Sequence, residues 1–286
     1  MARRLAGKPP AQALRERIKG AVEEEQKKSG RVPGLAVVRV GQDPASAIYV
    51  KRKHEAAVQL GMRSFQEELG EDCSTRTLLE VVDHFNEDGA VHGILVQFPL
   101  PPGVDAERVV ERIRPAKDVD GLTRASQGAL MRHQPGLRPC TALGIMDLLA
   151  FYDIQVAGKR AVVVGRSALV GLPLALMLMQ QNATVTVIHS HTVNPAAIAA
   201  QADLLVVAAG KPGLVTGEWI KEGAVVVDVG INRLEGGLVG DVDVKAAQQR
   251  AAALTPVPGG VGLMTIAELM GNTWRAFSGQ MEGERE

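Results

Sequence analysis

The sequence is short of aromatic residues, of cysteine and of long apolar runs. Aromatic residues make up only 3% of the 286 positions, so Ala, Val, Leu and Ile must fill the core that an apolar content of 46% allows. The two cysteines, Cys73 and Cys140, have neither metal-binding nor redox spacing. They predict a protein of a reducing compartment, the cytoplasm, rather than a disulfide-bonded secreted domain.

Neither an excess of charge nor a membrane signal is present. Acidic and basic residues balance at 32 each, which removes the electrostatic argument for a nucleic acid or an anionic membrane as partner. No apolar run approaches the roughly 20 residues that span a bilayer. The opening "MARRLAGKPPAQALRERIKG" lacks the apolar segment of a secretory signal. We therefore expect no nucleic-acid partner and no membrane association.

The first half of the chain alternates between apolar runs and amphipathic segments. The sequence "GLAVVRVG" at 34–41 predicts a buried strand. A helix follows it, because Asp43 can cap the start, Pro44 suits the first turn and Gly61 can end it. A further strand is predicted over 62–69, and residues 91–102 are predicted to form a strand that runs into a proline-rich loop. Further helices are predicted over 10–28, 75–88 and near 105–113. This alternation predicts a parallel α/β sheet.

The second half continues the same alternation. A helix capped by Thr141 is predicted over 138–154, and residues 159–192 have the pattern strand, glycine-containing turn, helix, strand. Two more buried strands, "ADLLVVAAG" and "GAVVVDVGIN", follow, and then the loop that begins with "TPVPGG". The spacing of Thr265 and Glu268 predicts the start of the last helix. We expect residues 278–286 to be disordered.

The stretch "VVVGRSALVG" at 162–171 has the layout of a dinucleotide-binding turn. Gly165 allows a tight turn and Gly171 allows close packing of helix on strand, so the helix N-terminus can face a pyrophosphate. Ser167 stands where the middle glycine of G-x-G-x-x-G is usual. The alternative is a flavodoxin-like sheet whose first turn merely contains glycine.

The next predicted strand indicates which cofactor is used. NAD-binding folds usually carry an acid about 20 residues on for the ribose 2′-hydroxyl, yet no acid occurs between Gly165 and Asp203. Arg166 can pair with a 2′-phosphate instead, which favours NADP. His189 and His191 at this strand end are possible metal ligands, but no third ligand is evident.

The segment "PASAIYVKRKHEAAVQLG" at 44–61 places Tyr49 and Lys53 four positions apart, on one face of the predicted helix. A lysine whose pKa is lowered by partial burial can accept a proton from water. The alternative is a solvated lysine in a charged patch, which is how we interpret Lys51 and Arg52.

Eight segments together resemble one family, the bifunctional methylenetetrahydrofolate dehydrogenase/methenyltetrahydrofolate cyclohydrolases. They occur in the family order and at similar separations over nearly the whole chain. The segments are "PASAIYVKRK", "GILVQFPLPP", "PAKDVDGLT", "RPCTALG", "VVVGRSALVGLP", "DVGIN", "GDVD" and "PVPGGVGLMT".

The resemblance implies an α/β fold of two domains, an N-terminal α/β substrate domain and a Rossmann-like NADP-binding domain, with a cleft between them. Residues 1–140 with the C-terminal helix 264–286 would form the folate-binding catalytic domain, and residues 141–263 the nucleotide domain. The family oxidises 5,10-methylenetetrahydrofolate with NADP⁺ to the 5,10-methenyl cation, which water opens to 10-formyltetrahydrofolate. The resemblance also implies a homodimer.

By resemblance, Tyr49 and Lys53 match the family's Tyr-x-x-x-Lys pair, Gln97 matches its glutamine after a strand, and Asp120 matches its folate-binding aspartate. The first three are the expected catalytic residues. The resemblance implies further substrate-binding residues, Ser46, Pro258 and Gly259, and cofactor-binding residues, Gly165, Arg166, Ser167, Gly171, Ser190 and Ile231.

These side chains suggest roles. Gln97 can hold Lys53 in place, Tyr49 can pack on the substrate's aromatic part, and Asp120 can accept two hydrogen bonds from the pterin. The alternatives are a polar residue that ends a strand for Gln97 and a turn cap before Gly121 for Asp120.

Two positions depart from the family pattern. Ala142 and Leu263 stand where proline is usual, so we expect a looser helix start and a less rigid loop bordering the cleft. Two other functions stay open at this point: a dehydrogenase without useful cyclohydrolase activity, and a nucleotide-binding regulator without turnover.

Overall fold

The computed structural model describes residues 2–283, and the chain divides into two compact units. Unit 1 comprises the residues up to Gln12 together with Thr141–Thr265, and unit 2 comprises Ala13–Cys140 together with the residues from Ile266 on. Three helices contain the points at which the chain changes unit: α1 (Lys8–Ser29), α6 (Cys140–Phe151) and α10 (Val261–Gly283).

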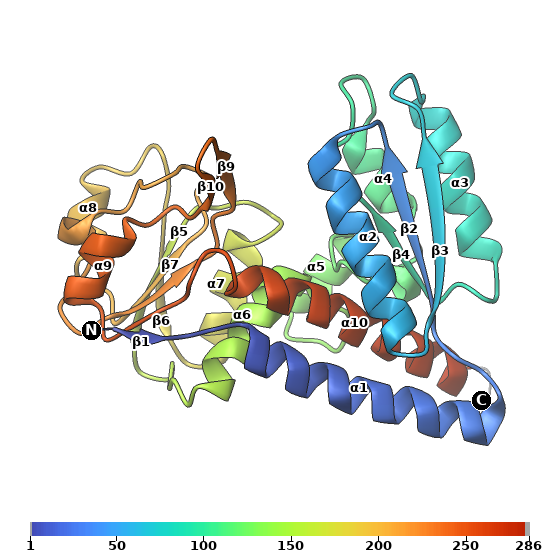
Figure 1. Cartoon of the computed structure of the whole chain (residues 1–286), viewed down its shortest axis with the longest axis horizontal. Helices are drawn as coiled ribbons and strands as arrows, with labels where there is room; N and C mark the ends of the chain where they lie inside the picture. Colours follow the sequence, from blue (N-terminus) through green and yellow to red (C-terminus); the bar gives the residue numbers. More distant parts are fainter. Residues whose placement is uncertain (1, 284–286) are drawn as a thin grey trace. The chain divides into compact units, whose positions relative to one another are not determined.

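Unit 2 is built on a parallel sheet in the order β3-β2-β4. The strands are β2 (Gly34–Val40), β3 (Arg63–Leu69) and β4 (Gly93–Val96). The helices are α2 (Pro44–Gln59), α3 (Thr75–Glu87), α4 (Ala106–Arg112) and α5 (Arg124–Met131), with a 3-10 turn η1 (Pro115–Lys117). Helices α2 and α3 lie on opposite sides of this sheet (Figure 1).

The core of unit 2 follows from the sequence of its central strand. Ala36, Val38 and Val40 of β2 alternate along one face and are buried with Val82 of α3 and with Ile113, which directly follows α4. Because helices cover both faces of the sheet, the central strand β2 is apolar almost throughout, as expected for a strand buried on both faces.

Helix α2 begins and ends where its sequence predicts. The carboxylate of Asp43 accepts a 2.7 Å hydrogen bond from the backbone N–H of Ser46, and Pro44 is the first helical residue. Gly61, just beyond the end of α2, has φ of +80°, which glycine adopts without strain.

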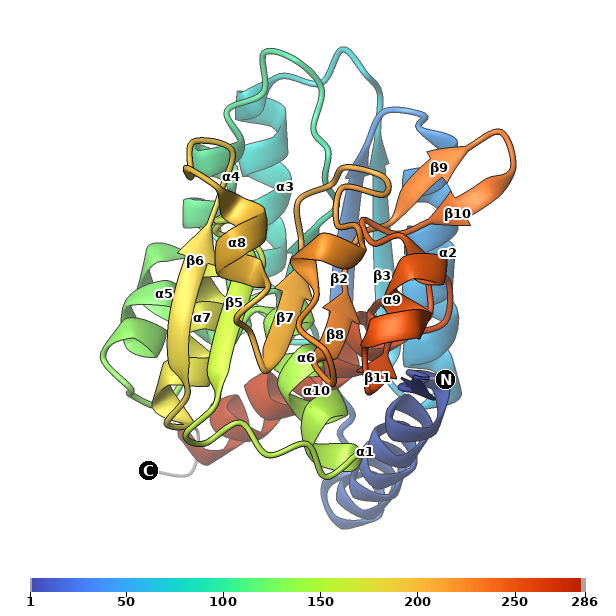
Figure 2. The ribbon, with the colours of Figure 1, turned by 90° about the vertical axis from the view of Figure 1, so that its left-hand side faces the viewer.

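Unit 1 holds a six-stranded parallel sheet in the order β1-β11-β8-β7-β5-β6. Figure 2 shows β6, β5, β7 and β8 side by side. Its strands are β1 (Arg3–Arg4), β5 (Arg160–Val164), β6 (Thr184–Ile188), β7 (Leu204–Val207), β8 (Val225–Asp228) and β11 (Ala253–Leu254). A separate antiparallel hairpin pairs β9 (Asn232–Leu234) with β10 (Gly237–Val239).

The helices of unit 1 cover the two faces of this sheet. Helix α7 (Gly171–Gln180) packs on β5 and β6. Alanines from α8 (Pro195–Ala199) and α9 (Val244–Arg250) share a core with alternate strand residues such as Val162 and Leu205. The 3-10 turn η2 (Gly217–Trp219) packs on α8 and α9. Counted from β5, five of the strands lie in the doubly wound order 2-1-3-4-5, with β1 added at the edge, and ligands bind at the carboxyl ends of the strands in such a sheet.

The ends of the long helices differ from the sequence-based expectation. Helix α6 begins at Cys140, so Thr141 lies inside it and is not its cap. Helix α10 begins at Val261, and Thr265 lies one turn inside, where its hydroxyl donates to the carbonyl of Val261 at 3.3 Å. Leu263 is therefore helical and not part of a loop. Residues 278–283, expected to be disordered, continue α10, and residues 284–286 lie outside the described part.

The first residues of the chain also differ from the expected domain division. Arg3 and Arg4 form β1, which pairs in parallel with β11, so this segment belongs to unit 1 although the sequence grouped it with the substrate domain. Tyr152 also binds this segment, since its hydroxyl donates a 2.8 Å hydrogen bond to the carbonyl of Ala6. Within residues 2–283, no helix is long and apolar enough to cross a membrane.

Candidate active site and nucleotide pocket

Lys53 projects from α2 toward the end of the neighbouring strand β4. Its Nζ donates a 2.8 Å hydrogen bond to Oε1 of Gln97. The backbone N–H of Gln97 donates to Val38 of β2 at 2.8 Å, and its Nε2 donates to the carbonyl of Phe98 at 2.6 Å. These two bonds orient the amide of Gln97, so that its oxygen faces Lys53 and holds the amine in place.

The surroundings of Lys53 disfavour its charged form. Burial lowers the pKa of Lys53, while the nearby carboxylate of Asp120 and the thiol of Cys140 act in the opposite direction. Burial likewise raises the pKa of Asp120, and the charge of Lys53 opposes that change. Burial keeps the pKa of Cys140 well above its ordinary value. Lys53, Asp120 and Cys140 therefore form one electrostatically coupled group in unit 2.

Asp120 itself does not cap the turn in which it lies. That role belongs to Asp118, whose carboxylate accepts from the backbone of Leu122 at 3.1 Å and of Thr123 at 2.8 Å, and from the hydroxyl of Ser126 at 2.6 Å. The alternative role considered for Asp120, capping of this turn, is thus filled by Asp118. The carboxylate of Asp120 stays available for the coupled group with Lys53.

The other predicted substrate residues lie in two places. Tyr49 is half-buried on α2, one turn before Lys53, and Ser46 is buried in the first turn of that helix. Pro258 and Gly259 belong to unit 1, in the loop between β11 and α10, where the carbonyl of Gly259 accepts from Gly7 at 2.8 Å. The participation of these four residues in one site stays a prediction.

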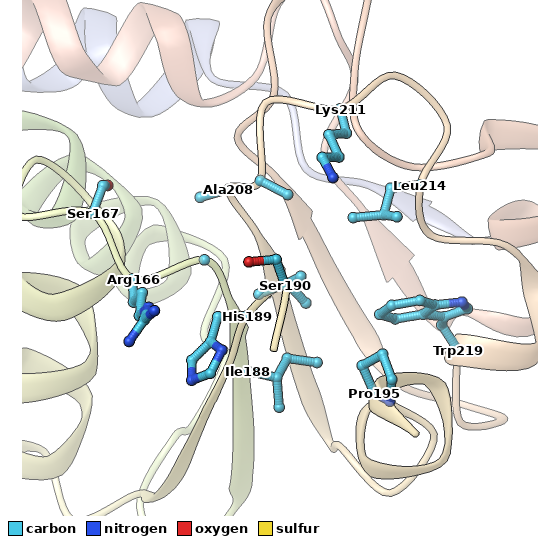
Figure 3. A pocket seen from close by; sticks show the side chains of 13 residues that line it. Arg166, Ser167, Ile188, His189, Ser190, Pro195, Ala208, Lys211, Leu214 and Trp219 are labelled. Carbon is cyan, nitrogen blue, oxygen red and sulfur yellow. The ribbon is translucent and has the colours of Figure 1, made fainter. Parts of the chain in front are cut away.

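A pocket with a volume of about 590 Å³ opens at the carboxyl ends of β5, β6 and β7 (Figure 3). In open parallel sheets this end of the strands is where nucleotides bind. Four of the predicted cofactor residues line it: Gly165, Arg166, Ser167 and Ser190. The other lining residues are Val164, Ile188, His189, Pro195, Ala208, Ala209, Lys211, Leu214 and Trp219.

The first turn of the nucleotide unit needs both of its glycines. Gly165 has φ of +116°, and a Cβ on Gly171 would lie 2.1 Å from the carbonyl oxygen of Gly165. Gly171 is therefore required for close packing of α7 and does not itself line the pocket. Ile231 does not line it either; its side chain is half exposed just before β9.

The charge of the pocket suits an anionic ligand. Among its lining residues, Arg166 and Lys211 are cations, and none is Asp or Glu. Figure 3 shows the side chain of Lys211 directed into the pocket from the end of β7. Lys211 and Trp219 are not among the residues predicted from the sequence, although the position of Lys211 just after an apolar strand is a usable signal.

Two buried carboxylates support one wall of this pocket. Oδ2 of Asp241 accepts from the backbone of Ala209 at 2.7 Å and of Gly210 at 2.8 Å. The backbone of Asp241 donates to Asp228 at 3.0 Å. Burial raises the pKa of Asp228 to about 6, although three backbone N–H bonds oppose this shift. The motifs "DVGIN" and "GDVD" contain these two aspartates, so their side chains fix the backbone that forms this wall of the pocket.

The two histidines after β6 are not arranged as a metal site. The backbone N–H of His191 donates to Nδ1 of His189 at 3.2 Å, so this ring nitrogen already serves as an acceptor. No group of three or more His, Cys, Asp or Glu side chains within residues 2–283 is placed to hold a metal ion.

Comparison with known proteins agrees with both units. A family model described as "Tetrahydrofolate dehydrogenase/cyclohydrolase, catalytic domain" matches residues 5–120, and the model of the NAD(P)-binding domain of the same family matches residues 139–281. The latter match argues against the alternative in which the first turn of this sheet merely contains glycine.

The chain is 50% identical to the bifunctional protein FolD of Halothermothrix orenii, over 96% of this chain and 98% of that protein. The crystal structure of the bifunctional FolD methylenetetrahydrofolate dehydrogenase/cyclohydrolase of Campylobacter jejuni has a TM-score of 0.95 at 42% identity, over 98% of this chain and all (100%) of that one. The enzyme of Trypanosoma brucei, solved with NADP cofactor and an inhibitor, has a TM-score of 0.94 at 40% identity, over 98% of both chains. The chain therefore belongs to the tetrahydrofolate dehydrogenase/cyclohydrolase family.

Proposed function

We propose that this protein oxidises 5,10-methylenetetrahydrofolate to 5,10-methenyltetrahydrofolate with NADP⁺ and then hydrolyses the product to 10-formyltetrahydrofolate, with Lys53 at the reacting centre. Family membership supports the pair of reactions. The observation that carries the role of Lys53 is its 2.8 Å hydrogen bond to Gln97 in surroundings that lower its pKa.

In the oxidation, the substrate loses a hydride and becomes a cation. When bound, NADP⁺ accepts that hydride. A full positive charge on Lys53 would oppose the developing cation, and burial of the amine reduces this repulsion by favouring its neutral form. Gln97 is uncharged, so it fixes Lys53 without adding a charge of its own.

In the hydrolysis, a water oxygen forms a bond to the methenyl carbon while one of its protons passes to Nζ of Lys53. Collapse of this adduct breaks one carbon–nitrogen bond, and the ring nitrogen that leaves takes up a proton, which Lys53 can return. The net change is addition of one water and release of one proton from the cation. Lys53 thus acts as general base and then as general acid.

Asp120 is the orienting residue for the pterin. A carboxylate in this position can accept two parallel hydrogen bonds from the amino-pyrimidine edge, which fixes the ring without taking part in bond changes. Tyr49, one turn before Lys53, supplies a ring for stacking on the substrate's aromatic part. We assign Ser46, Pro258 and Gly259 to the same substrate.

The pocket of unit 1 fits NADP. It has room for a nucleotide, it lacks acids, and its cations and the hydroxyl of Ser190 stand at neighbouring strand ends. We assign Arg166 and Ser190 to binding of the 2′-phosphate. Gly165 and Ser167 would let the backbone of the first turn approach the pyrophosphate closely. Gly171 acts through packing, and Ile231 remains assigned by resemblance alone.

We also infer that residues 1–140 with 264–286 bind the folate and that residues 141–263 bind the nucleotide. The β1 segment is the exception, since it pairs with β11.

A cytoplasmic homodimer completes the proposal. Free thiols at Cys73 and Cys140 favour a reducing compartment. Half-exposed Leu172 and Met179 on α7, beside the edge strand β6, favour a second copy as partner. Sedimentation of the wild type against Leu172→Asp tests the dimer: a wild-type monomer refutes it.

One incubation separates the proposed function from its alternatives. The protein is mixed with 5,10-methylenetetrahydrofolate and NADP⁺, and the methenyl absorbance is followed. A rise followed by an enzyme-dependent decay supports both activities. A rise without that decay favours a dehydrogenase alone, and no rise despite cofactor binding favours a regulator. Cofactor binding is followed through the fluorescence of Trp219, which lines the pocket.

A further inference from the structure

Asn272 of α10 reaches the segments that carry the coupled group of unit 2. It is fully buried, with 0% of its surface exposed. Its Nδ2 donates 2.8 Å hydrogen bonds to two backbone carbonyls, those of Val119 and Arg138, and lies 3.5 Å from the sulfur of Cys140. One side chain therefore donates to a buried and a partly buried acceptor from two segments that are separate in sequence.

The two carbonyls flank the proposed folate site. Val119 directly precedes Asp120, and Arg138 lies two positions before Cys140, whose thiol also donates to Val119 at 3.2 Å. A Cβ placed on Gly121 would lie 2.4 Å from the carbonyl carbon of Arg138, so the two segments touch directly. Asp120 thus lies between Val119, whose carbonyl is bound by Asn272, and Gly121, which packs against Arg138.

The orientation of the Asn272 amide is itself set by a neighbour. Nη1 of Arg275 donates to Oδ1 of Asn272 at 2.9 Å and pairs with Oε2 of Glu268 at 3.3 Å. Because a guanidinium only donates, the amide oxygen must face Arg275 and the amide N–H₂ must face the two carbonyls. Glu268 is fully buried, whereas the side chain of Arg275 is 41% exposed.

We propose that Asn272 is a positioning residue for the folate: it locks the Val119 and Arg138 backbones together and so fixes the carboxylate of Asp120 relative to Lys53. This inference rests on the proposed role of Asp120. Removing the two donors leaves the carbonyl of Arg138 without this partner and that of Val119 with only the weakly donating thiol of Cys140, and the backbone relieves this loss by moving. Asp120 then meets the pterin in the wrong place, and both reactions weaken because they use one pterin site.

The test compares Asn272→Leu, which keeps the volume and removes both donors, with Thr273→Val. Thr273 is the next residue, equally buried, and its hydroxyl donates to Leu269 of the same helix at 2.8 Å. The control therefore loses a buried hydrogen bond that does not reach Asp120. We expect Asn272→Leu to raise KM for both folates by about tenfold, the effect of about 1.4 kcal/mol of lost orientation. Thr273→Val should leave KM within about twofold, and both variants should keep the wild-type Kd for NADP⁺.

Three outcomes would overturn the proposal: an unchanged KM in Asn272→Leu, an equal rise of KM in the control, or a loss confined to kcat. If Asn272→Leu does not fold, Asn272→Ser, which keeps one donor, is compared with the same control and is expected to raise KM by a smaller factor. Asp120→Asn is measured in parallel. If it leaves KM unchanged, the assigned role of Asp120 fails; if it raises KM while the Asn272 variants do not, only the positioning role fails.

Discussion

Lys53 and Gln97 are joined by a 2.8 Å hydrogen bond, although 44 positions separate them in the chain. Helix α2 follows the central strand β2, and Gln97 comes directly after β4, which pairs with β2 in parallel. The carboxyl ends of parallel strands meet at one edge of the sheet, and this edge brings the amine to the amide. The predictions below distinguish residues that take part in bond changes from residues that only orient the substrate.

Lys53→Met should abolish most of the hydration activity. Methionine keeps much of the stem but removes the proton acceptor, and general acid–base help is worth about 10²–10⁴-fold. Dehydrogenase activity should fall less, because that step needs placement of charge more than a base. The assay supplies the methenyl compound without NADP⁺ and follows its loss. Lys51→Met is the matched control: the side chain of Lys51 is 77% exposed on the same helix, and this variant should behave as the wild type.

The pH dependence of hydration should report on Lys53. Only the neutral amine accepts a proton, so the rate should rise with pH through an apparent pKa below the ordinary lysine value of about 10.4. The charge of Asp120 raises the pKa of Lys53, so its removal in Asp120→Asn should lower that pKa and move the rising limb to lower pH. Rates are compared at saturating methenyl substrate. A limb that moves to higher pH, or that persists in Lys53→Met, would contradict this assignment.

Asp120→Asn should also weaken folate binding without affecting the cofactor. The amide places a donor where the pterin presents another donor, so KM for both folates should rise by about tenfold or more. Kd for NADP⁺, measured by Trp219 fluorescence, should stay unchanged. Asp118→Asn serves as contrast, since Asp118 holds the turn and should act mainly on stability. Normal folate affinity in Asp120→Asn would remove Asp120 from the site.

Arg166 and Lys211 should differ in their effect on the two nicotinamide cofactors. Arg166→Ala removes the proposed partner of the 2′-phosphate, so KM for NADP⁺ should rise by about tenfold or more while that for NAD⁺ changes little. Lys211 follows β7, on the far side of β5 from β6, and should meet the part that both cofactors share. Lys211→Ala should therefore raise both KM values by similar factors. Equal effects of Arg166→Ala on both cofactors would refute its role in selectivity.

Leu263→Pro should change stability little. Leu263 lies in the first turn of α10, and its backbone N–H donates to Gly260 at 3.2 Å. Proline removes that bond at a cost of about 0.5–1.5 kcal/mol and restricts the unfolded chain, which gains about 0.4–1 kcal/mol. The free energy of unfolding, measured in urea beside Leu263→Ala, should stay within about 1 kcal/mol of the wild type. A loss above about 1.5 kcal/mol would show that the proline ring strains this turn.

The sequence by itself determined the features that depend on neighbouring residues. The cap of α2 follows from Asp43 and Pro44, and the strands of both units follow from apolar runs and turn residues, because these preferences act within a few positions. The choice of NADP is also local, since it rests on the absence of an acid after the second nucleotide-unit strand. For the same reason the family could be recognised from short segments.

Only the tertiary structure decided what depends on distant segments. The lowered pKa of Lys53 comes from burial, which outweighs the opposing effect of Asp120 and Cys140, and desolvation has no counterpart in a linear pattern. The two-residue strand β1 exists because β11 pairs with it, and no local preference predicts so short a strand. Asn272 is one polar residue within a long helix until folding places two carbonyls beside it. Local preferences are set by adjacent residues, whereas burial and hydrogen bonding across the fold arise only when the chain has packed.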